Sequence, residues 1–242
     1  MRAKPFTTLT GPTVPISANP TEMFLSFFTS QLIDHIVIET NRYAAACLTA
    51  LHKGDGPVPE WKICAEEIKA YLGFSLLMSI NRLPDLYDYW STNDTLHYFP
   101  VASRIPRKRF LEIQRYLHFT DNDTIVPHGQ EGYDRLAKVR PVIESICKQF
   151  LADCLLHKEN AVDEAMIPFK GRSSLKQYLP LKPVKHGFKV WVRADSTNGY
   201  ICVVVRRVCV CVFSCVHVCM CVCMCVSACV RVVHVYVYYP LS

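Results

Sequence analysis

The sequence predicts an α+β fold, in which a helical N-terminal region is followed by a short sheet and then by a low-complexity tail. Three observations lead to this prediction. Apolar residues recur at helical spacing through most of residues 19–150. From Asn160 the period changes to the alternation that is typical of strands. From Cys202 the chain alternates Val and Cys and contains no acidic residue.

Asn19 marks the start of the first predicted helix, because an Asn cap followed by Pro20 and an early acid is a helix-start pattern. The apolar spacing that follows predicts one helix as far as Ala46. A second helix is predicted over residues 65–80, and Pro84 lies just beyond its end.

Two later prolines mark further helices. Pro106 opens a helix with a basic first half, and Pro141 lies at the start of a helix that carries Phe150 on its apolar side. The stretches over residues 87–100 and 121–132 are predicted to be irregular.

Strands are predicted in the segment that follows these helices. Residues 160–168 form a short apolar run, and residues 188–194 alternate apolar with polar positions. Asn198-Gly199 is a turn signal, so we expect residues 200–205 to return as a third strand.

The segment around the first strand carries the chemistry. Asp163 is predicted to lie at the end of that strand, and from Lys170 to Arg193 the chain contains bases but no acid. This order suits a carboxylate that holds a divalent metal beside a phosphate backbone. The residues that we predict to contact DNA are Lys170, Arg172, Lys176, Lys182, Lys185 and Lys189. The alternative is an ordinary solvated basic face.

Other polar and aromatic residues of this segment are predicted to be structural. Glu164 follows Asp163 directly, so its side chain points to the opposite face of the strand. Asp195 is predicted to shape the hairpin rather than to bind metal. His186 is expected to be structural or exposed, and Trp191 is expected to lie in the core.

The overall charge is a weak guide to partners. The net charge is +6, and all 21 acidic residues and 24 of the 27 basic residues precede Cys202. The residues after Met1 are polar rather than apolar, so no signal peptide is visible. We therefore expect a nuclear or cytosolic protein.

The Val/Cys tail over residues 206–242 has three interpretations. Valine and cysteine codons together form a GT repeat, so the tail is interpreted first as a microsatellite read as protein. Its uncharged run over residues 208–230 is also long enough to span a membrane. Its Cys-x-Cys spacing could bind soft metals.

Short motifs distributed along the chain resemble the piggyBac-type transposases and the piggyBac transposable element-derived proteins. They are ETNRY at 39–43, EIKAYLG at 67–73, YWS at 89–91, RKRF at 107–110, LHFTDN at 117–122, KVRP at 138–141, VDE at 162–164, FKGR at 169–172, QYLP at 177–180, KP at 182–183, KHGFK at 185–189 and DSTNGY at 195–200. Their order and spacing are more specific than any single motif. The resemblance covers residues 20–203.

The resemblance implies an RNase H-like catalytic domain that cuts and pastes DNA. In the family three aspartates hold two divalent ions, Mg²⁺ in the intact enzymes, which activate the attacking oxygen. Asp163 matches the first of the three. The second and third have no counterpart, because the sequence diverges into Val-Cys repeats soon after Tyr200. One carboxylate cannot hold a metal pair, so we expect no cofactor in this chain.

Composition and resemblance together indicate a domain organisation. Residues 1–18 are rich in Thr and Pro and are interpreted as a flexible arm. Residues 19–158 are interpreted as a helical region similar to the family's dimerisation or DNA-binding region. Residues 159–205 are interpreted as an incomplete RNase H-like core with the first three strands of its sheet.

We therefore expect a truncated, catalytically inactive transposase remnant, located in the nucleus, or cytoplasmic or aggregated if it misfolds. DNA is its implied partner, a homodimer is possible, and no small-molecule substrate is expected. Two alternatives remain open: a non-catalytic DNA-binding or regulatory protein, and a protein anchored in a membrane by its tail.

Overall fold

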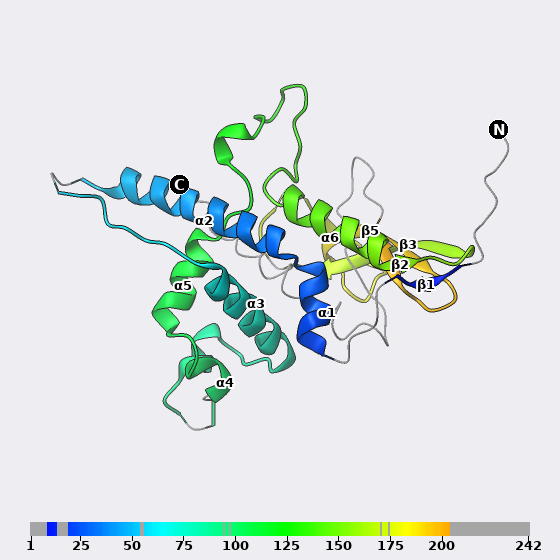
Figure 1. Ribbon diagram of the computed structural model, residues 1–242, viewed down its shortest axis with the longest axis horizontal. Helices are drawn as coiled ribbons and strands as arrows, with labels where there is room; N and C mark the ends of the chain where they lie inside the picture. Colours follow the sequence, from blue (N-terminus) through cyan, green and yellow to red (C-terminus); the bar gives the residue numbers. More distant parts are fainter. Residues whose placement is uncertain are drawn as a thin grey trace. The chain divides into compact units, whose positions relative to one another are not determined.

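The computed structural model describes residues 9–13, 19–53, 56–93, 95–96, 98–169, 171–173 and 175–203. Lys170 and the Val/Cys tail lie outside these described residues, and so do the membrane and soft-metal interpretations of the tail. The described chain forms two compact units, coloured along the sequence in Figure 1. One unit runs from Ser30 to Val142, and the other combines the residues before Ser30 with those from Ile143 onward.

The unit from Ser30 to Val142 is helical. Its elements are α2 (Ser30–Leu51), α3 (Ala65–Ile80), η1 (Leu86–Trp90), α4 (Phe99–Ala102), α5 (Arg107–Tyr116) and η2 (Asn122–Thr124). Helix α3 has the predicted bounds, and α5 begins directly after Pro106. The core of this unit includes Ile36, Ile68, Met78 and Ile113, each almost fully buried. The predicted helical spacing therefore marks the buried side of these helices.

An ion pair joins α3 to α5. The Arg109 guanidinium donates to both carboxylate oxygens of Glu67, at 2.7 and 2.8 Å, and to the backbone oxygen of Lys62 at 2.6 Å. Glu67 also accepts from the backbone N–H of Cys64, the N-cap residue that precedes α3. The hydrogen bonds from Arg109 hold the pKa of Glu67 below its ordinary value. Arg109 of the predicted basic helix is therefore a structural residue.

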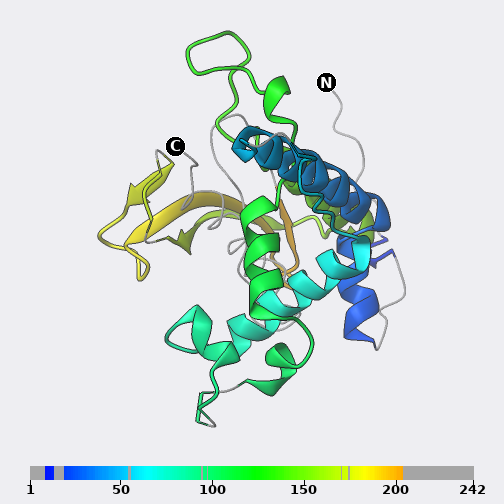
Figure 2. The ribbon, with the colours of Figure 1, turned by 90° about the vertical axis from the view of Figure 1, so that its left-hand side faces the viewer.

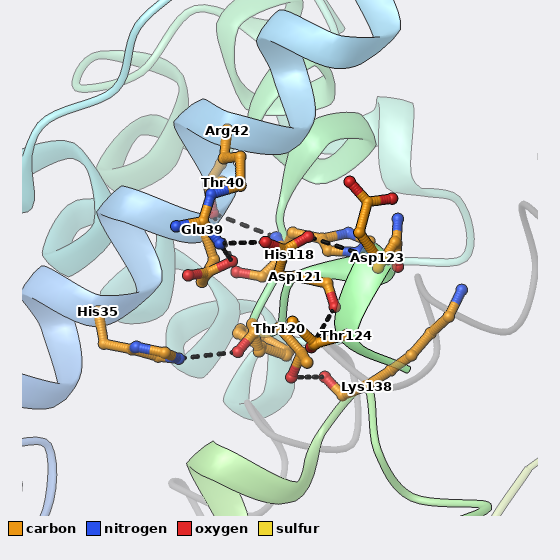
Figure 3. Close-up of polar contacts among 12 residues, drawn as sticks. His35, Glu39, Thr40, Arg42, His118, Thr120, Asp121, Asp123, Thr124 and Lys138 are labelled. Atoms are coloured by element: carbon orange, nitrogen blue, oxygen red, sulfur yellow. Dashed lines mark hydrogen bonds and ion pairs between the residues drawn. The ribbon is translucent and has the colours of Figure 1, made fainter. Parts of the chain in front are cut away.

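A second polar cluster fixes the segment after α5 against α2 (Figure 3). The Thr40 hydroxyl donates to the backbone oxygen of His118 and accepts from its N–H, and His35 contacts the backbone oxygen of Phe119 at 2.8 Å. Arg42 bridges Glu39 and Asp121 at 2.9 Å each. Burial lowers the pKa of His118 below its ordinary value. His118 is therefore a structural residue of the helical unit.

The other unit contains helices α1 (Pro20–Phe27) and α6 (Arg140–Asp153), the latter with its first residues in the helical unit. The prediction of one helix from Asn19 to Ala46 is wrong, because α1 ends at Phe27 and α2 begins at Ser30 and continues to Leu51. Phe27 packs on Phe150 of α6, with ring centroids 4.8 Å apart, within its own unit. Within the predicted flexible arm, β1 (Gly11–Pro12) pairs with β2 (Cys154–Leu155).

An antiparallel sheet completes this unit. The central strand β5 (His186–Asp195) pairs along one edge with β3 (Asn160–Pro168). Along its other edge it pairs first with β4 (Lys176–Tyr178) and then with β6 (Ile201–Val203). The three predicted strands are confirmed as β3, β5 and β6, and β4 was not predicted.

The faces of the sheet differ in burial. Directly paired residues lie on one face, so Phe188, Val190 and Val192 share a face with Ile167 of β3, and all four are buried. The opposite face carries Trp191, which is 38% exposed. The prediction that Trp191 lies in the core is therefore wrong.

The crossing of β3 and β5 requires a glycine at position 187. Gly187 is buried opposite Pro168, and a Cβ placed there would lie 1.9 Å from the backbone oxygen of Ile167. No side chain fits in that space, so the glycine of the KHGFK motif has a packing role.

No helix among the described residues is long and apolar enough to cross a membrane.

Candidate nucleic-acid interface

Asp163 lies within β3, and not at its end as predicted. It follows Val162 in the nine-residue strand Asn160–Pro168 and pairs with Val192 of β5. Its side chain is exposed, and its Oδ1 accepts from the backbone N–H of Glu164 at 2.7 Å. Asp163 therefore presents an accessible carboxylate on an edge strand.

Glu164 belongs to a different group on the opposite face. It pairs with Trp191, and its carboxylate forms an ion pair with Lys189. The Lys189 ammonium also lies 5.0 Å from the centroid of the Trp191 ring, at the distance of a cation–π contact. Glu164 is thus committed to a cation and cannot join Asp163, as the alternation of the strand predicts.

Asp195 is fully buried at the end of β5 and carries structural hydrogen bonds. Oδ2 accepts from the backbone N–H and from Nδ1 of His157, both at 2.7 Å, and Oδ1 accepts from the N–H of Thr197 at 2.9 Å. Its backbone oxygen accepts from Gly199, whose φ of 72° suits the turn. Burial opposes ionisation, but these hydrogen bonds outweigh it and lower the pKa of Asp195 to about 2. This matches the predicted role in the hairpin.

The carboxylates of this unit do not fit a two-metal site. A metal pair needs several anionic ligands within reach of ions about 3.5–4 Å apart. Asp163 and Asp195 belong to opposite faces of the sheet by their register, and Glu164 is paired with Lys189. Among the described residues no group of three or more His, Cys, Asp or Glu side chains could hold a metal ion.

The predicted DNA-contacting residues fall into three groups. Lys176 donates to the backbone oxygen of Gly171 at 2.9 Å, Lys182 donates to that of Glu164 at 3.4 Å, and Lys189 is the ion-paired residue described above. Arg172 and Lys185 are exposed, and neither has an ion-pair partner within the part of the chain that the structure describes. Lys170 lies outside the described residues.

The hairpin formed by β4 and β5, which carries Lys176, Lys182, Lys185 and Lys189, was not predicted from the sequence. Strand β4 pairs Lys176 with Phe188 and Tyr178 with His186, whose rings stack at 4.6 Å. Figure 2 shows β4 and the start of β5 in yellow, at one end of the sheet. Because β4 is short and polar, only the turn residue Pro180 and the strand-forming Tyr178 could have indicated it.

Comparisons with known proteins identify relatives of this chain. The family described as "Transposase IS4" matches residues 19–207. The human PiggyBac transposable element-derived protein 2 is 33% identical over 183 residues, which are 76% of this chain and 28% of that protein. The human PiggyBac transposable element-derived protein 3 is 30% identical over 190 residues, 77% of this chain and 29% of that protein. The chain thus spans less than a third of the length of these two relatives.

A solved structure shares the fold. A structure of a piggyBac transposase synaptic complex with hairpin DNA aligns with a TM-score of 0.67 and 24% identity, over 83% of this chain and 41% of that chain. The family match, the human relatives and the shared fold together show that this chain belongs to the piggyBac-type family of DDE transposases.

Proposed function

We propose that this chain is a piggyBac-derived DNA-binding protein that contacts the phosphate backbone and has no transposase activity of its own. The observation that carries the proposal is the pair of exposed cations, Arg172 and Lys185, in a segment without acids from Ala165 to Ala194. Cations without a carboxylate partner are available to replace the counterions of DNA. The solved piggyBac transposase complex that shares this fold contains hairpin DNA, which supports the choice of partner.

Binding of this kind is expected to be salt-sensitive and poorly sequence-specific. Phosphate contacts fix the position of a protein on DNA but carry no sequence information. Lys176, Lys182 and Lys189 add to the local positive potential, while their ammonium groups are engaged within the protein. We also propose a nuclear location, where such a protein meets its partner. The homodimer stays a prediction.

Charge reversal tests the binding. The double variant Arg172→Glu and Lys185→Glu should lose most of the affinity of the full chain for duplex DNA in a fluorescence anisotropy titration. Lys148→Glu is the matched control, because Lys148 is an exposed lysine on α6 of the same unit. Equal losses in the double variant and in the control would contradict a specific role for this segment.

Catalytic inactivity is tested separately. The described carboxylates do not form a metal-binding set, so we expect no Mg²⁺-dependent nicking or hairpin formation on terminal-repeat DNA. The measurement is gel analysis of end-labelled DNA incubated with the full chain and Mg²⁺. Cleavage that is abolished by Asp163→Ala would refute the proposal, since Asp163 would then be a working ligand.

A further inference from the structure

The loop between β4 and β5 holds a single apolar side chain away from the protein. Leu181 is 98% exposed, more than any other large apolar side chain in the described part of the chain. Single apolar side chains are common on protein surfaces, so the exposure of Leu181 alone does not indicate a binding site. The hydrogen bonds of the loop and the lysines beside Leu181 provide further evidence for a binding role.

The loop is fixed at its base and at its tip. The N–H of Leu179 donates to the backbone oxygen of Lys185 at 2.8 Å, and the N–H of Lys182 donates to that of Leu179 at 3.2 Å. The second of these bonds closes a turn with Pro180 and Leu181 at its two central positions. Pro180 and Pro183 restrict the backbone on both sides of Leu181. The loop therefore presents Leu181 with little conformational entropy left to lose on binding.

The surroundings of Leu181 are basic and partly aromatic. Lys182 and Lys185 follow it in the loop, and the stacked rings of Tyr178 and His186 close the hairpin below it. Tyr178 is itself 57% exposed. A protein interface is centred on a larger apolar area that is depleted in charged residues. A single exposed leucine that is followed by two lysines instead fits an anionic polymer whose stacked units can be separated by an apolar side chain, as in duplex DNA.

We propose that Leu181 is a wedge that inserts between base pairs of duplex DNA while Lys185, which is exposed in the same loop, binds a neighbouring phosphate. This inference rests on the DNA binding proposed above. DNA-bending proteins insert leucine and other apolar side chains into the minor groove, where they partly unstack a base step and kink the duplex. Pyrimidine–purine steps such as TA unstack most easily, so they are the expected sites.

The test measures DNA distortion and DNA affinity on the same complex. The full chain is titrated into a short duplex that carries 2-aminopurine at a TA step, whose fluorescence rises when the base unstacks. The wild-type chain should raise the fluorescence at saturation. Leu181→Ala should lose this rise and keep the salt-dependent binding, because it leaves Arg172 and Lys185 in place. Leu181→Met should retain the rise, since methionine also serves as a wedge.

Val162→Ala is the matched control, because Val162 is 61% exposed on β3 of the same unit and should not affect the signal. Saturable binding without a fluorescence rise, or an equal rise with Leu181→Ala, would overturn the wedge and leave the proposed DNA binding standing. No salt-dependent binding by the wild-type chain would overturn both. Binding to anionic lipid vesicles that Leu181→Ala alone abolishes, without DNA distortion, would assign Leu181 to a membrane surface and also overturn the wedge.

Discussion

Asp195 is a carboxylate whose environment favours its charged form strongly. Three donors from His157 and Thr197 converge on it in a fully buried position, and they lower its pKa to about 2 from an ordinary value of 3.8. A carboxylate with a depressed folded-state pKa binds fewer protons folded than unfolded. Its stabilising effect is therefore complete above the unfolded value of 3.8 and is lost as the pH falls toward 2.

Asp195→Asn tests this reasoning. The amide cannot accept all three hydrogen bonds, so the variant should lose about 1–3 kcal/mol of unfolding free energy at neutral pH, the usual cost of leaving a buried polar group unsatisfied. Between pH 4 and pH 2 the wild-type protein should lose stability more steeply than the variant. Urea unfolding followed by circular dichroism at several pH values measures both. Parallel pH curves for the two proteins would show that Asp195 does not contribute as described.

The residues of the candidate site were predictable in type but not in placement. Trp191 was placed in the core because its side chain is apolar, although the alternation of β5 puts it on the same face as Lys189 and Arg193. The sequence also does not show which lysines are free to bind DNA, because a lysine paired with Glu164 and a lysine in solvent have the same residue type. Asp195 was placed correctly because the Asn198-Gly199 signal marks the turn that it supports.

At the scale of elements, Gly187 controls whether β3 and β5 can pair. Gly187→Ala would place a methyl group 1.9 Å from the backbone oxygen of Ile167, so one strand must move. We expect a loss of about 2–3 kcal/mol in unfolding free energy, the upper part of the usual range for overpacking. Urea unfolding measures it.

Gly73→Ala is the control for this substitution. Gly73 lies in α3 and a Cβ there meets nothing within 4 Å, so alanine should stabilise the protein by roughly 0.5–1 kcal/mol through its helix propensity. If both alanine variants changed stability in the same direction, the close approach of β3 and β5 would not be the cause.

Elements with clear end signals were predicted well. The bounds of α3 and β3 are as expected, because Pro84 follows α3 and the period changes at Asn160. The break at Phe28–Thr29 was missed. The apolar spacing continues across it although Phe27 packs within one unit and Ile36 lies in a helix of the other. Spacing reports that a residue is buried, not in which core.

At the scale of the whole molecule, charge position matters more than net charge. The net charge of +6 is modest, and several bases in the acid-free segment are engaged inside the protein. A cation that is free in solvent displaces the counterions of DNA when it binds a phosphate. A cation that is already paired within the protein does so less efficiently. The structure thus separates Lys185, which is exposed, from Lys189, which is paired with Glu164 and lies over Trp191.

The salt dependence of DNA affinity distinguishes the exposed lysine from the paired one. Anisotropy titrations at several salt concentrations give the slope of log K against log salt for the full chain, for Lys185→Gln and for Lys189→Gln. The expected result is a slope about 0.9 smaller in magnitude for Lys185→Gln, which corresponds to one lost phosphate contact, and a nearly unchanged slope for Lys189→Gln. Equal slopes in all three proteins, or an affinity that does not depend on salt, would contradict DNA binding through the exposed bases of this segment.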